Sequence, residues 1–394
     1  MDLDEITVAV AAAVGLAEGP AGVRDVLRAV AWHEPIAARD LSRATELPVP
    51  IVTAVCGELR RRGVVDQTRP VRLTLAARTE LARASPHLAA ACQRCDGLGM
   101  RIPPEVESLA PLLEEVAAGA PPARMELDQT HCTIPTKLRR VLRMHQAGAL
   151  DGTAVLLLGD DDLIAVALAL FQSLIGGGIR RLAAIDSDPA VLGWITERTA
   201  GIGLAVEAIE HDLRDPLPDR VVGQFDVVGT DPPYTLSGAE LFLTRAVAAL
   251  APGPGRHVFF SFGARRPADT LATQELICRL GLAIRSVTPN FNTYAGAGVL
   301  GGTSHLYHLR TTGSSAPNAQ RRYDGPLYTA DARIDSQRPY RCAGCGAVQA
   351  VGPGGSFTLI ADLRRAGCPA CGGTTFRPLP RRDDSRDAAG RRRG

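Results

Sequence analysis

Residues 128–312 alternate short apolar runs with helical patterns of apolar residues, and this alternation constrains the fold more than any other feature. Strands of a parallel sheet are buried on both faces and read as continuous apolar runs, with helices between them. The pattern therefore predicts an α/β domain with a parallel, Rossmann-like sheet. The predicted strands are residues 154–158, 182–185, 205–209, 225–228, 257–262, 283–287 and 305–309.

The first predicted strand runs directly into Gly159-Asp160-Asp161-Asp162, and an apolar helix follows. Nucleotide-like ligands bind at this strand-to-helix turn in open α/β sheets. One aspartate there would serve as a helix N-cap, but three exceed what capping needs. Adjacent carboxylates attract cations, and their repulsion favours keeping one of them protonated. We interpret Asp160, Asp161 and Asp162 as catalytic candidates, and Gly159 and Asp160 as contacts for a nucleotide-bearing cofactor.

Acidic residues also follow the second and third predicted strands. Asp186 and Asp188 come at the end of the second strand, where an acid of a doubly wound sheet is well placed to bind ribose hydroxyls. Asp212 follows the third strand, where it would contact an adenine edge. Each acid is a weak signal alone, but together they extend the predicted cofactor site beyond the Gly-Asp-Asp-Asp turn.

The fourth predicted strand ends in Asp231-Pro232-Pro233-Tyr234, the most distinctive short motif of the chain. The prolines fix the backbone and lack N–H donors, which leaves carbonyl oxygens and the Asp231 carboxylate to accept hydrogen bonds from an amine. The Tyr234 ring can stack on a planar amine or contact a cation. The spacing from the first strand to this motif suits a fold that binds an S-adenosyl donor. Asp231 is thus a catalytic candidate, and Asp231, Pro232 and Tyr234 are substrate-binding candidates.

A polar segment, Asn290-Phe291-Asn292-Thr293-Tyr294, follows the sixth predicted strand. Its amide and phenol groups would line a pocket for the acceptor, so Asn290, Asn292 and Tyr294 are further substrate-binding candidates. A polar loop without a direct function is an equally good interpretation.

The N-terminal residues 1–85 have the pattern of a winged helix. Three short helices are expected between residues 21 and 62, and residues 64–65 and 71–75 would form a hairpin around Arg69-Pro70. Such a fold binds DNA through its third helix in some proteins and mediates dimerisation in others. The basic cluster Arg60-Arg61-Arg62 lies at the C-terminal end of the third helix, although base contacts usually come from the N-terminal part. DNA binding is therefore the less favoured alternative.

Two cysteine pairs near the C-terminus, Cys342/Cys345 and Cys368/Cys371, have the spacing of a tetrahedral zinc site. They predict a structural zinc ribbon over residues 341–380. Another pair, Cys92/Cys95, lies in a proline-rich connector over residues 86–127 and forms only half a site. The remaining cysteines are interpreted as buried thiols; they are Cys56, Cys132 and Cys278.

Composition excludes several classes of protein. The 44 basic and 42 acidic residues nearly balance, so nucleic acid is an unlikely partner. No apolar run reaches the roughly 18–20 residues that span a bilayer, and the acidic N-terminus does not suit a signal peptide. Nine cysteines, an odd number, argue against a disulfide framework. We therefore expect a cytoplasmic protein, with a polar linker at residues 313–340 and a disordered Arg/Asp tail at residues 381–394.

Taken together, these motifs resemble the branched-chain polyamine synthases, that is, the bis(aminopropyl)spermidine synthases. The resemblance extends from about residue 21 to residue 312, and the order and spacing of the motifs are more specific than any one of them. The motifs are the winged-helix pattern, Cys92-x-x-Cys95, Asp128-Gln129, Met144-His145, Gly159-Asp160-Asp161-Asp162-Leu163, Asp212-Leu213-Arg214-x-Pro216-Leu217-Pro218, Asp231-Pro232-Pro233 and Asn290-Phe291-Asn292-x-Tyr294.

The resemblance implies a class I methyltransferase-type sheet over residues 128–312 behind the winged helix, commonly in a homodimer. The donor would be decarboxylated S-adenosylmethionine, and the acceptor a linear polyamine such as spermidine. Gly-Asp-Asp-Asp is the catalytic motif of the family, and Asp161 would engage the attacking amine. An ammonium cannot attack, so a nearby carboxylate must orient the amine and take its proton. Asp160, Asp162 and Asp231 would hold the remaining charges of the polyamine.

The chain departs from the family pattern in two places. The family usually has an acidic residue at the position of Tyr234 and an acidic C-terminal tail, whereas residues 381–394 hold six arginines and three aspartates. Both changes reduce the attraction for cations. The sequence therefore leaves open a second hypothesis, in which S-adenosylmethionine donates a methyl or a 3-amino-3-carboxypropyl group to another amine. In a third hypothesis the protein is a non-enzymatic regulator.

Overall fold

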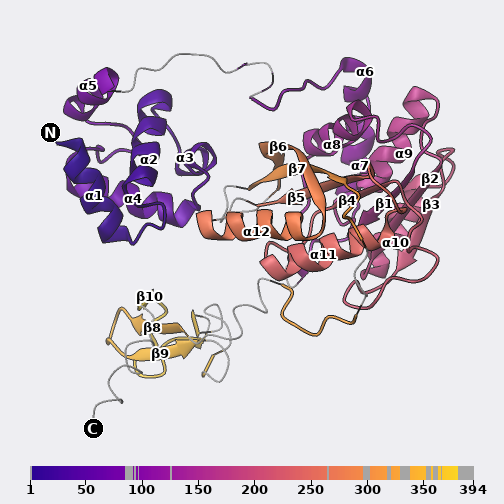
Figure 1. The fold of residues 1–394 in the computed structure, drawn as a ribbon. Coiled ribbons are helices and arrows are strands. Elements are labelled where there is room, and N and C mark those ends of the chain that lie inside the picture. The colour runs from indigo at the N-terminus through magenta and orange to yellow at the C-terminus, as the bar shows by residue number, and fades with distance from the viewer. Residues whose placement is uncertain are drawn as a thin grey trace, which may run out of the picture. The chain divides into compact units, whose positions relative to one another are not determined.

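The chain forms two units, residues 1–324 and 325–394, in the computed structural model (Figure 1). Among its described residues, the first unit has one hydrophobic core in its N-terminal helices and further buried apolar side chains around its sheet. The second unit has a small core of its own. The structure describes residues 2–84, 92, 95, 97–124, 127–263, 266–295, 302–316, 321–328, 338–351, 356–357, 363–364 and 366–379.

Five described helices make up the N-terminal part of the first unit. The apolar residues that predicted the first of three short helices, Val23, Val26, Leu27 and Val30, are buried in its core. The sequence analysis missed the outer two of the five helices. The helices are α1 (Leu3–Val14), α2 (Gly19–His33), α3 (Ala38–Thr45), α4 (Val49–Arg61) and α5 (Leu75–Ala84).

The hairpin predicted after α4 is reduced to isolated bridges. Val65 pairs with Leu73, and Val71 pairs with Ile36, which precedes α3. The predicted second strand is wrong at its end, because Leu75 begins helix α5. The carbonyl oxygen of Thr74 already accepts the first helical hydrogen bond, from the amide of Arg78 (2.9 Å).

A seven-stranded sheet forms the centre of the first unit, and all seven predicted strands are present. Strands β1 to β5 are mutually parallel in the order β3-β2-β1-β4-β5, as in doubly wound nucleotide-binding sheets. Strand β7 is antiparallel to both of its neighbours, β5 and β6. The strands are β1 (Ala154–Leu158), β2 (Arg181–Asp186), β3 (Val206–Glu210), β4 (Val227–Thr230), β5 (His257–Phe262), β6 (Leu282–Thr293) and β7 (Thr303–Thr311).

Helices cover both faces of this sheet (Figure 1). Right-handed crossovers place the helices that connect β1, β2 and β3 on one face and those that follow β4 and β5 on the other. Helix α8 packs against α9 on the first face. The helices of this region are α6 (Pro104–Glu107), α7 (Ala110–Ala118), α8 (Ile134–Gln146), α9 (Ile164–Ile175), α10 (Pro189–Thr199), α11 (Leu236–Ala249) and α12 (Pro267–Arg279).

Strand β6 is longer than predicted. The sequence analysis ended it at Val287, but the strand continues to Thr293 and includes most of the segment taken as a following loop. Its register with β7 shifts between Thr288 and Asn292, and Asn290 has a positive φ of 52°. Pro289, which cannot donate to a ladder, and this irregular residue interrupt the strand pattern in the sequence. After the shift the strand resumes its pairing with β7, through Asn292 with Ser304 and Thr293 with Thr303.

The second unit contains a three-stranded antiparallel sheet in the order β10-β8-β9. Its strands are β8 (Arg338–Cys342), β9 (Val348–Val351) and β10 (Phe376–Pro378). The tail expected at residues 381–394 lies outside the described residues. Across the described part of the chain, no single helix is long and apolar enough to cross a membrane; α1 and α2 reach that length only as a pair bent by 112°.

Candidate active site and metal centre

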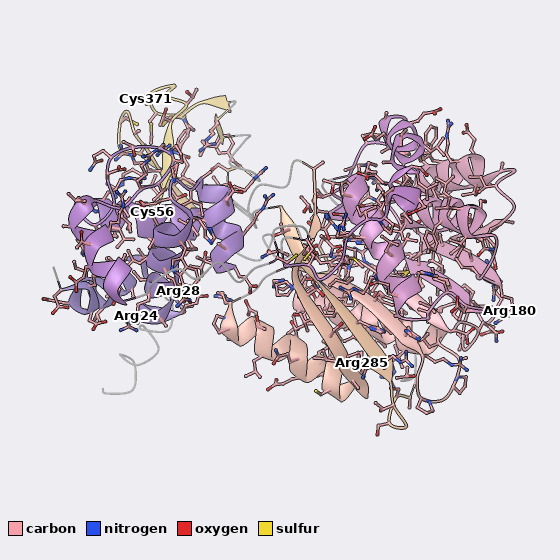
Figure 2. The ribbon with its side chains drawn as sticks, turned by 90° about the horizontal axis from the view of Figure 1, so that it is seen from above. Arg24, Arg28, Cys56, Arg180, Arg285 and Cys371 are labelled. Carbon is pink, nitrogen blue, oxygen red and sulfur yellow. The ribbon has the colours of Figure 1, made fainter. Side chains whose placement is uncertain are left out.

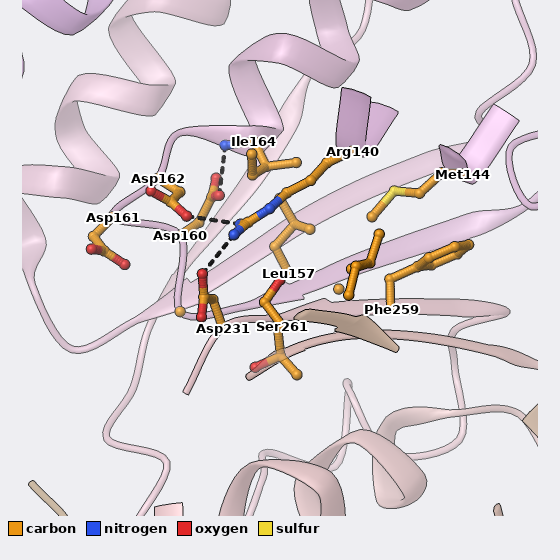
Figure 3. Close-up of a pocket in the computed structure, with 14 residues that line it drawn as sticks. Arg140, Met144, Leu157, Asp160, Asp161, Asp162, Ile164, Asp231, Phe259 and Ser261 are labelled. Carbon is orange, nitrogen blue, oxygen red and sulfur yellow. Dashed lines mark hydrogen bonds and ion pairs between the residues drawn. The ribbon is translucent and has the colours of Figure 1, made fainter. Parts of the chain in front are cut away.

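The carboxyl ends of β1 and β4 lie side by side where the strand order reverses, which is where ligands of open α/β sheets bind. A pocket opens there (Figure 3), at the kind of position where open α/β sheets bind small molecules. It brings together the Gly159–Asp162 turn and Asp231, which lie far apart in the sequence. Its other lining residues are Arg140, Met144, Leu157, Ile164, Gly229, Thr230, Phe259, Ser261 and Leu306.

The carboxylate of Asp160 caps helix α9. Its Oδ1 accepts a hydrogen bond from the Ile164 amide (2.7 Å), and its Oδ2 accepts one from the Ala165 amide (2.9 Å). Burial raises the pKa of Asp160 to about 8, although both amide bonds oppose the shift. One of the three aspartates is thus committed to the capping role that the sequence allowed.

The carboxylate of Asp162 is held entirely by the protein. Oδ1 accepts from the backbone N–H of Cys132 (2.5 Å), and Oδ2 accepts from Nη1 of Arg140 (2.7 Å). Burial disfavours its charge, but Arg140 and Lys137 outweigh burial and hold the pKa of Asp162 below its usual range. Asp162 therefore remains a carboxylate and anchors Arg140.

Arg140, on helix α8, lies at the centre of the pocket and is almost completely buried. Besides Asp162, it donates through Nη2 to Oδ2 of Asp231 (2.6 Å) and through Nε to Oδ1 of Asn292 (2.8 Å). Figure 3 shows the guanidinium between the two carboxylates. Burial alone would lower the pKa of Arg140, but Tyr294 and the two carboxylates raise it well above its usual value. One cation thus ties β4 and β6 to the turn after β1.

A hydrogen-bonded network of side chains surrounds Asp231. The Tyr294 hydroxyl donates to Oδ2 of Asp231 (2.6 Å), and the Tyr234 hydroxyl lies 3.2 Å from Oδ1 and 2.9 Å from the Tyr294 oxygen. Asn292 donates to the hydroxyls of Ser261 (3.1 Å) and Ser304 (2.9 Å). Burial raises the pKa of Asp231 to about 6, against the effect of Arg140. Three predicted substrate residues, Tyr234, Asn292 and Tyr294, therefore position this carboxylate.

Asp161 differs from its two neighbours. Among the described residues, none donates a hydrogen bond to its carboxylate, although its backbone carbonyl accepts one from Nδ1 of His131 (2.9 Å). Figure 3 shows the carboxylate apart from the marked contacts. Burial, reinforced by the nearby carboxylates of Asp162, Asp186 and Asp231, raises the pKa of Asp161 well above its usual value. Asp161 is the member of the triplet left for a ligand.

The predicted cofactor residues lie at the ends of β2 and β3. Asp186 is linked to the triplet, because its Oδ2 accepts from the Asp160 amide (3.0 Å) while its Oδ1 accepts from the Asp188 amide (2.9 Å). Asp188 caps α10 through the Ala190 amide (2.9 Å). Asp212 accepts from the Arg214 amide (2.9 Å) in a half-buried turn. None of these three side chains lines the pocket itself.

Two predicted substrate residues lie outside the network around Asp231. The side-chain oxygen of Asn290 accepts a hydrogen bond from the Thr303 hydroxyl (2.9 Å), on the neighbouring strand. Pro232 is buried and is not among the lining residues of the pocket. Both residues shape the backbone next to the site rather than its surface.

Sequence reasoning missed Arg140 and its neighbour on α8, Lys137, which donates to the carbonyl oxygen of Asp162. A signal was present. Lys137 is the sole lysine of the chain, and Lys137, Arg140, Val141 and Met144 recur at the spacing of one helix face. Charged residues on an otherwise apolar face predict buried cations that need carboxylate partners.

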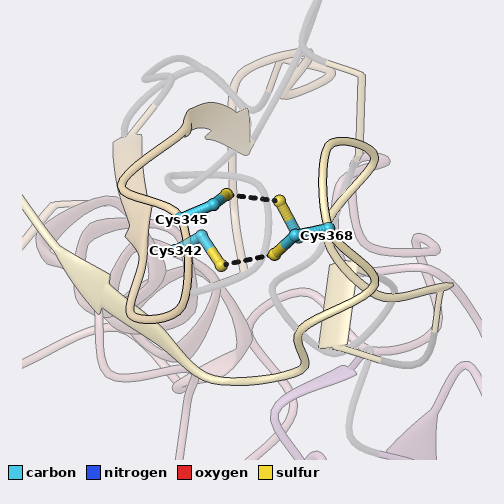
Figure 4. A group of neighbouring side chains, drawn as sticks. Cys342, Cys345 and Cys368 are labelled. Carbon is cyan, nitrogen blue, oxygen red and sulfur yellow. Dashed lines mark hydrogen bonds between the residues drawn. The ribbon is translucent and has the colours of Figure 1, made fainter.

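Four cysteines of the second unit form a cluster that could hold a metal (Figure 4). Their sulfur atoms lie within 4.8 Å of one another, with 3.6 Å between Cys342 and Cys371 and 3.6 Å between Cys345 and Cys368. A tetrahedral ZnS₄ centre with bonds of 2.3 Å requires a sulfur–sulfur distance of about 3.8 Å. The donor set and its geometry therefore fit zinc.

The structure confirms the predicted burial of two of the three single cysteines. Cys56 and Cys132 are buried, as expected, whereas the prediction for Cys278 is wrong because its side chain is exposed at the end of α12. The sulfur of Cys95 lies 3.8 Å from the carbonyl oxygen of Cys92. Among the described residues, only the C-terminal cysteines form a group suited to a metal.

Comparison with known proteins decides the family. Residues 109–312, more than half of the chain, match the family model described as the branched-chain polyamine synthase A C-terminal domain. The chain belongs to the branched-chain polyamine synthase family. It is 32% identical over 265 residues to the N(4)-bis(aminopropyl)spermidine synthase of Thermococcus kodakarensis, covering 64% of this chain and 72% of that relative.

Two further members of the comparison extend this similarity. An uncharacterized protein of Methanocaldococcus jannaschii is 29% identical over 378 residues, covering 94% of this chain and 92% of that protein. The branched-chain polyamine synthase of Thermus thermophilus, solved in complex with N4-aminopropylspermidine and 5'-methylthioadenosine, has a similar fold. The TM-score is 0.66, at 24% identity over 84% of this chain and 97% of that one.

We expect Arg140→Ala to lower the free energy of unfolding by about 3–5 kcal/mol, because it leaves two buried carboxylates without their cation. Urea denaturation followed by circular dichroism measures the loss. Arg279→Ala is the matched control, since Arg279 pairs with Glu240 at the surface, and its loss should stay below about 1 kcal/mol. Equal stability of the Arg140→Ala and wild-type proteins would contradict a central role for this cation.

We expect the purified protein to contain about one zinc ion per chain, bound by four thiolates. Inductively coupled plasma spectrometry should show that Cys345→Ser and Cys371→Ser lose most of the metal. Cys278→Ser, which changes an exposed cysteine outside the cluster, should retain it. Full metal content in the first two variants would show that the cluster is not the binding site.

Proposed function

We propose that the protein transfers an aminopropyl group from decarboxylated S-adenosylmethionine to an amine of a polyamine such as spermidine. The observation that carries the proposal is a pocket that crowds carboxylates and leaves the one of Asp161 without a partner among the described residues. The names of the relatives support it, because the Thermococcus protein is a bis(aminopropyl)spermidine synthase and the Thermus complex holds an aminopropylated polyamine with methylthioadenosine.

The reaction is a displacement at carbon. The lone pair of the amine nitrogen attacks the aminopropyl carbon next to the sulfonium, the carbon–sulfur bond breaks, and its electron pair leaves with neutral methylthioadenosine. The new nitrogen–carbon bond makes the nitrogen positive until its proton leaves. The sulfonium activates the carbon, so the protein must supply alignment and a neutral nucleophile.

Asp161 is suited to both requirements. Its free carboxylate can accept a hydrogen bond from the attacking amine, orient the lone pair and take the proton that is released. A raised pKa favours proton uptake, and the positive charge of the bound substrates offsets the repulsion among the carboxylates. Asp231, whose position is set by Arg140 and Tyr294, would contact a second nitrogen of the polyamine.

The remaining carboxylates act mainly through charge. Asp160 and Asp162 accept hydrogen bonds from groups of the protein. They would therefore attract the ammonium groups of the polyamine through their charge rather than through direct hydrogen bonds. Gly159 and Asp186 border the first strand-to-helix turn, and Asp188 and Asp212 lie at the neighbouring strand ends. We assign these four residues to the adenosine part of the donor, in line with ligand binding at the carboxyl ends of doubly wound sheets.

The proposal extends to the organisation of the chain. Residues 1–85 would form a winged-helix domain and residues 86–127 a connector, and the catalytic domain would cover residues 128–312. Residues 313–340 would link it to a zinc ribbon at residues 341–380. Zinc would supply a structural crosslink between the two cysteine pairs, with no part in the transfer. A homodimer acting in the cytoplasm belongs to the same proposal.

Product analysis by mass spectrometry tests the proposed reaction. The purified protein receives spermidine with decarboxylated S-adenosylmethionine, or with the intact donor. Methylthioadenosine and an aminopropylated polyamine, formed only from the decarboxylated donor, are the expected result. Methylthioadenosine from the intact donor would indicate 3-amino-3-carboxypropyl transfer instead, and S-adenosylhomocysteine would indicate methylation.

We expect Asp161→Asn to lower kcat/KM by about 10²- to 10⁴-fold, because an amide cannot take the proton. The melting temperature should stay equal or rise by about 1–3 °C, since the substitution removes a repelling charge. In the wild-type protein, kcat/KM should begin to fall at a pH well above the usual pKa range of an aspartate as the solution is acidified. The reason is that Asp161, whose pKa is raised, takes up its proton at that higher pH and can no longer act as the base. The Asp161→Asn profile should lack that acid limb.

Asp151→Asn provides the control for this prediction, because Asp151 is an exposed aspartate in the turn before β1. Its kcat/KM and pH profile should match those of the wild-type protein. Full activity of Asp161→Asn, or an unchanged acid limb, would remove Asp161 from the mechanism even if aminopropyl transfer is established.

A further inference from the structure

A second pocket lies between the C-terminal end of α8 and the strands β6 and β7, on the face of the sheet that α8 covers. It has a volume of about 590 Å³ and is lined by Arg143, Gln146, Ala147, Arg285, Ser286, His308 and Arg310. Phe259 lies between the two pockets, because it lines the first and stacks on His308 at 4.6 Å. The two pockets thus have opposite character, since the first is rich in carboxylates and the second in arginines.

A β-bulge increases the number of basic groups on this face. Ala283 pairs with Arg310 and Ile284 with Leu309, but Ser286 then pairs with His308, so Arg285 is the extra residue of β6. Bulges re-aim side chains from a strand. Arg285 and Ser286 therefore both line the pocket next to His308, and Arg285 is exposed on the edge strand (Figure 2).

The three guanidinium groups of the pocket have no acidic partner in the part of the chain that the structure describes. Among the described residues, no aspartate or glutamate forms an ion pair with Arg143, Arg285 or Arg310, and none lines the pocket. No atom of the described residues forms a hydrogen bond with the buried Nε of Arg143. Burial lowers the pKa of Arg143, because the charged guanidinium loses hydration free energy that no nearby anion replaces.

The two histidines beside the arginines contact each other and Arg310. Nη1 of Arg310, which can only donate, lies 2.6 Å from Nε2 and 3.2 Å from Nδ1 of His257. Nδ1 of His257 lies 3.0 Å from Nε2 of His308. Burial and neighbouring arginines hold the pKa of His308 at about 4, so the ring is neutral at pH 7.

We propose that this pocket binds a multiply charged phosphate-type oxyanion, with pyrophosphate as its simplest representative. Planar guanidinium groups bind phosphate oxygens through paired hydrogen bonds, and the hydroxyl of Ser286 and the amide of Gln146 add neutral donors. The proposal is independent of the proposed transferase activity, whose substrates are cations and would be repelled here.

A small phosphate ligand fits the geometry better than a nucleic acid. The basic groups converge on one concavity between α8 and the β6–β7 pair, whereas a nucleic acid is bound along an extended basic surface. The overall charge of +2 gives no long-range attraction for a polyanion of that size.

Isothermal titration calorimetry of the full chain with sodium pyrophosphate tests the proposal. At low ionic strength and pH 7.5 we expect saturable binding that sodium chloride of equal ionic strength does not reproduce. Arg285→Ala should weaken it about tenfold or more, as expected for the loss of a charge-assisted contact. Arg279→Ala, which removes another exposed arginine that has an acidic partner, should leave the affinity unchanged.

Three results would overturn the proposal. One is the absence of saturable binding up to about 10 mM pyrophosphate. Another is equal weakening by Arg285→Ala and Arg279→Ala, which would indicate general charge attraction. The third is Arg285-dependent binding of duplex DNA without any binding of pyrophosphate, which would assign the pocket to a nucleic-acid surface. Because aminopropyl transfer is not the readout, none of these results depends on the proposed function.

Discussion

The buried guanidinium of Arg140 is the interaction on which the rest of the active site depends. It contacts Asp162 after β1, Asp231 after β4 and Asn292 in β6, so one side chain joins three segments that are far apart in the sequence. The carboxylates of Asp162 and Asp231 lie 2.7 and 2.6 Å from this buried guanidinium, whose positive charge offsets part of their negative charge. Without this cation, the carboxyl ends of these strands would carry repelling charges in a buried crevice, and the pocket would lose the order that its chemistry requires.

The same arrangement explains why three adjacent aspartates have different properties. Asp160 binds helix amides, Asp162 binds Arg140, and Asp161 has neither partner. Burial, together with the neighbouring charges, raises the pKa of Asp161, so the free site favours bound protons that cationic substrates should displace. The pocket is therefore tuned to ligands that bring positive charge, which a polyamine and a sulfonium donor both do. Phe259 separates it from the arginine pocket, so one sheet face carries two sites of opposite charge.

Much of this could be predicted from the sequence. Apolar runs predict the seven buried strands but not their order, and the resemblance includes the Gly-Asp-Asp-Asp and Asp-Pro-Pro motifs, which the fold brings to one crevice. Arg140 and Lys137 were missed because a buried cation depends on partners that only the tertiary fold supplies. The division of roles within the triplet also could not be predicted, since Asp160, Asp161 and Asp162 are chemically identical until α9, α8 and β4 surround them. The end of β6 was wrong because Pro289 and Asn290 interrupt a strand that resumes after a register shift.

If burial and crowding keep the carboxylates of the free site partly protonated, the binding of a cationic polyamine must release protons. Calorimetric titration of spermidine at pH 7, with methylthioadenosine present and in buffers of different ionisation enthalpy, measures the protons exchanged on binding. We expect net proton release by the wild-type protein and a smaller release by Asp161→Asn. Identical proton release by both proteins, or none by the wild type, would contradict this expectation.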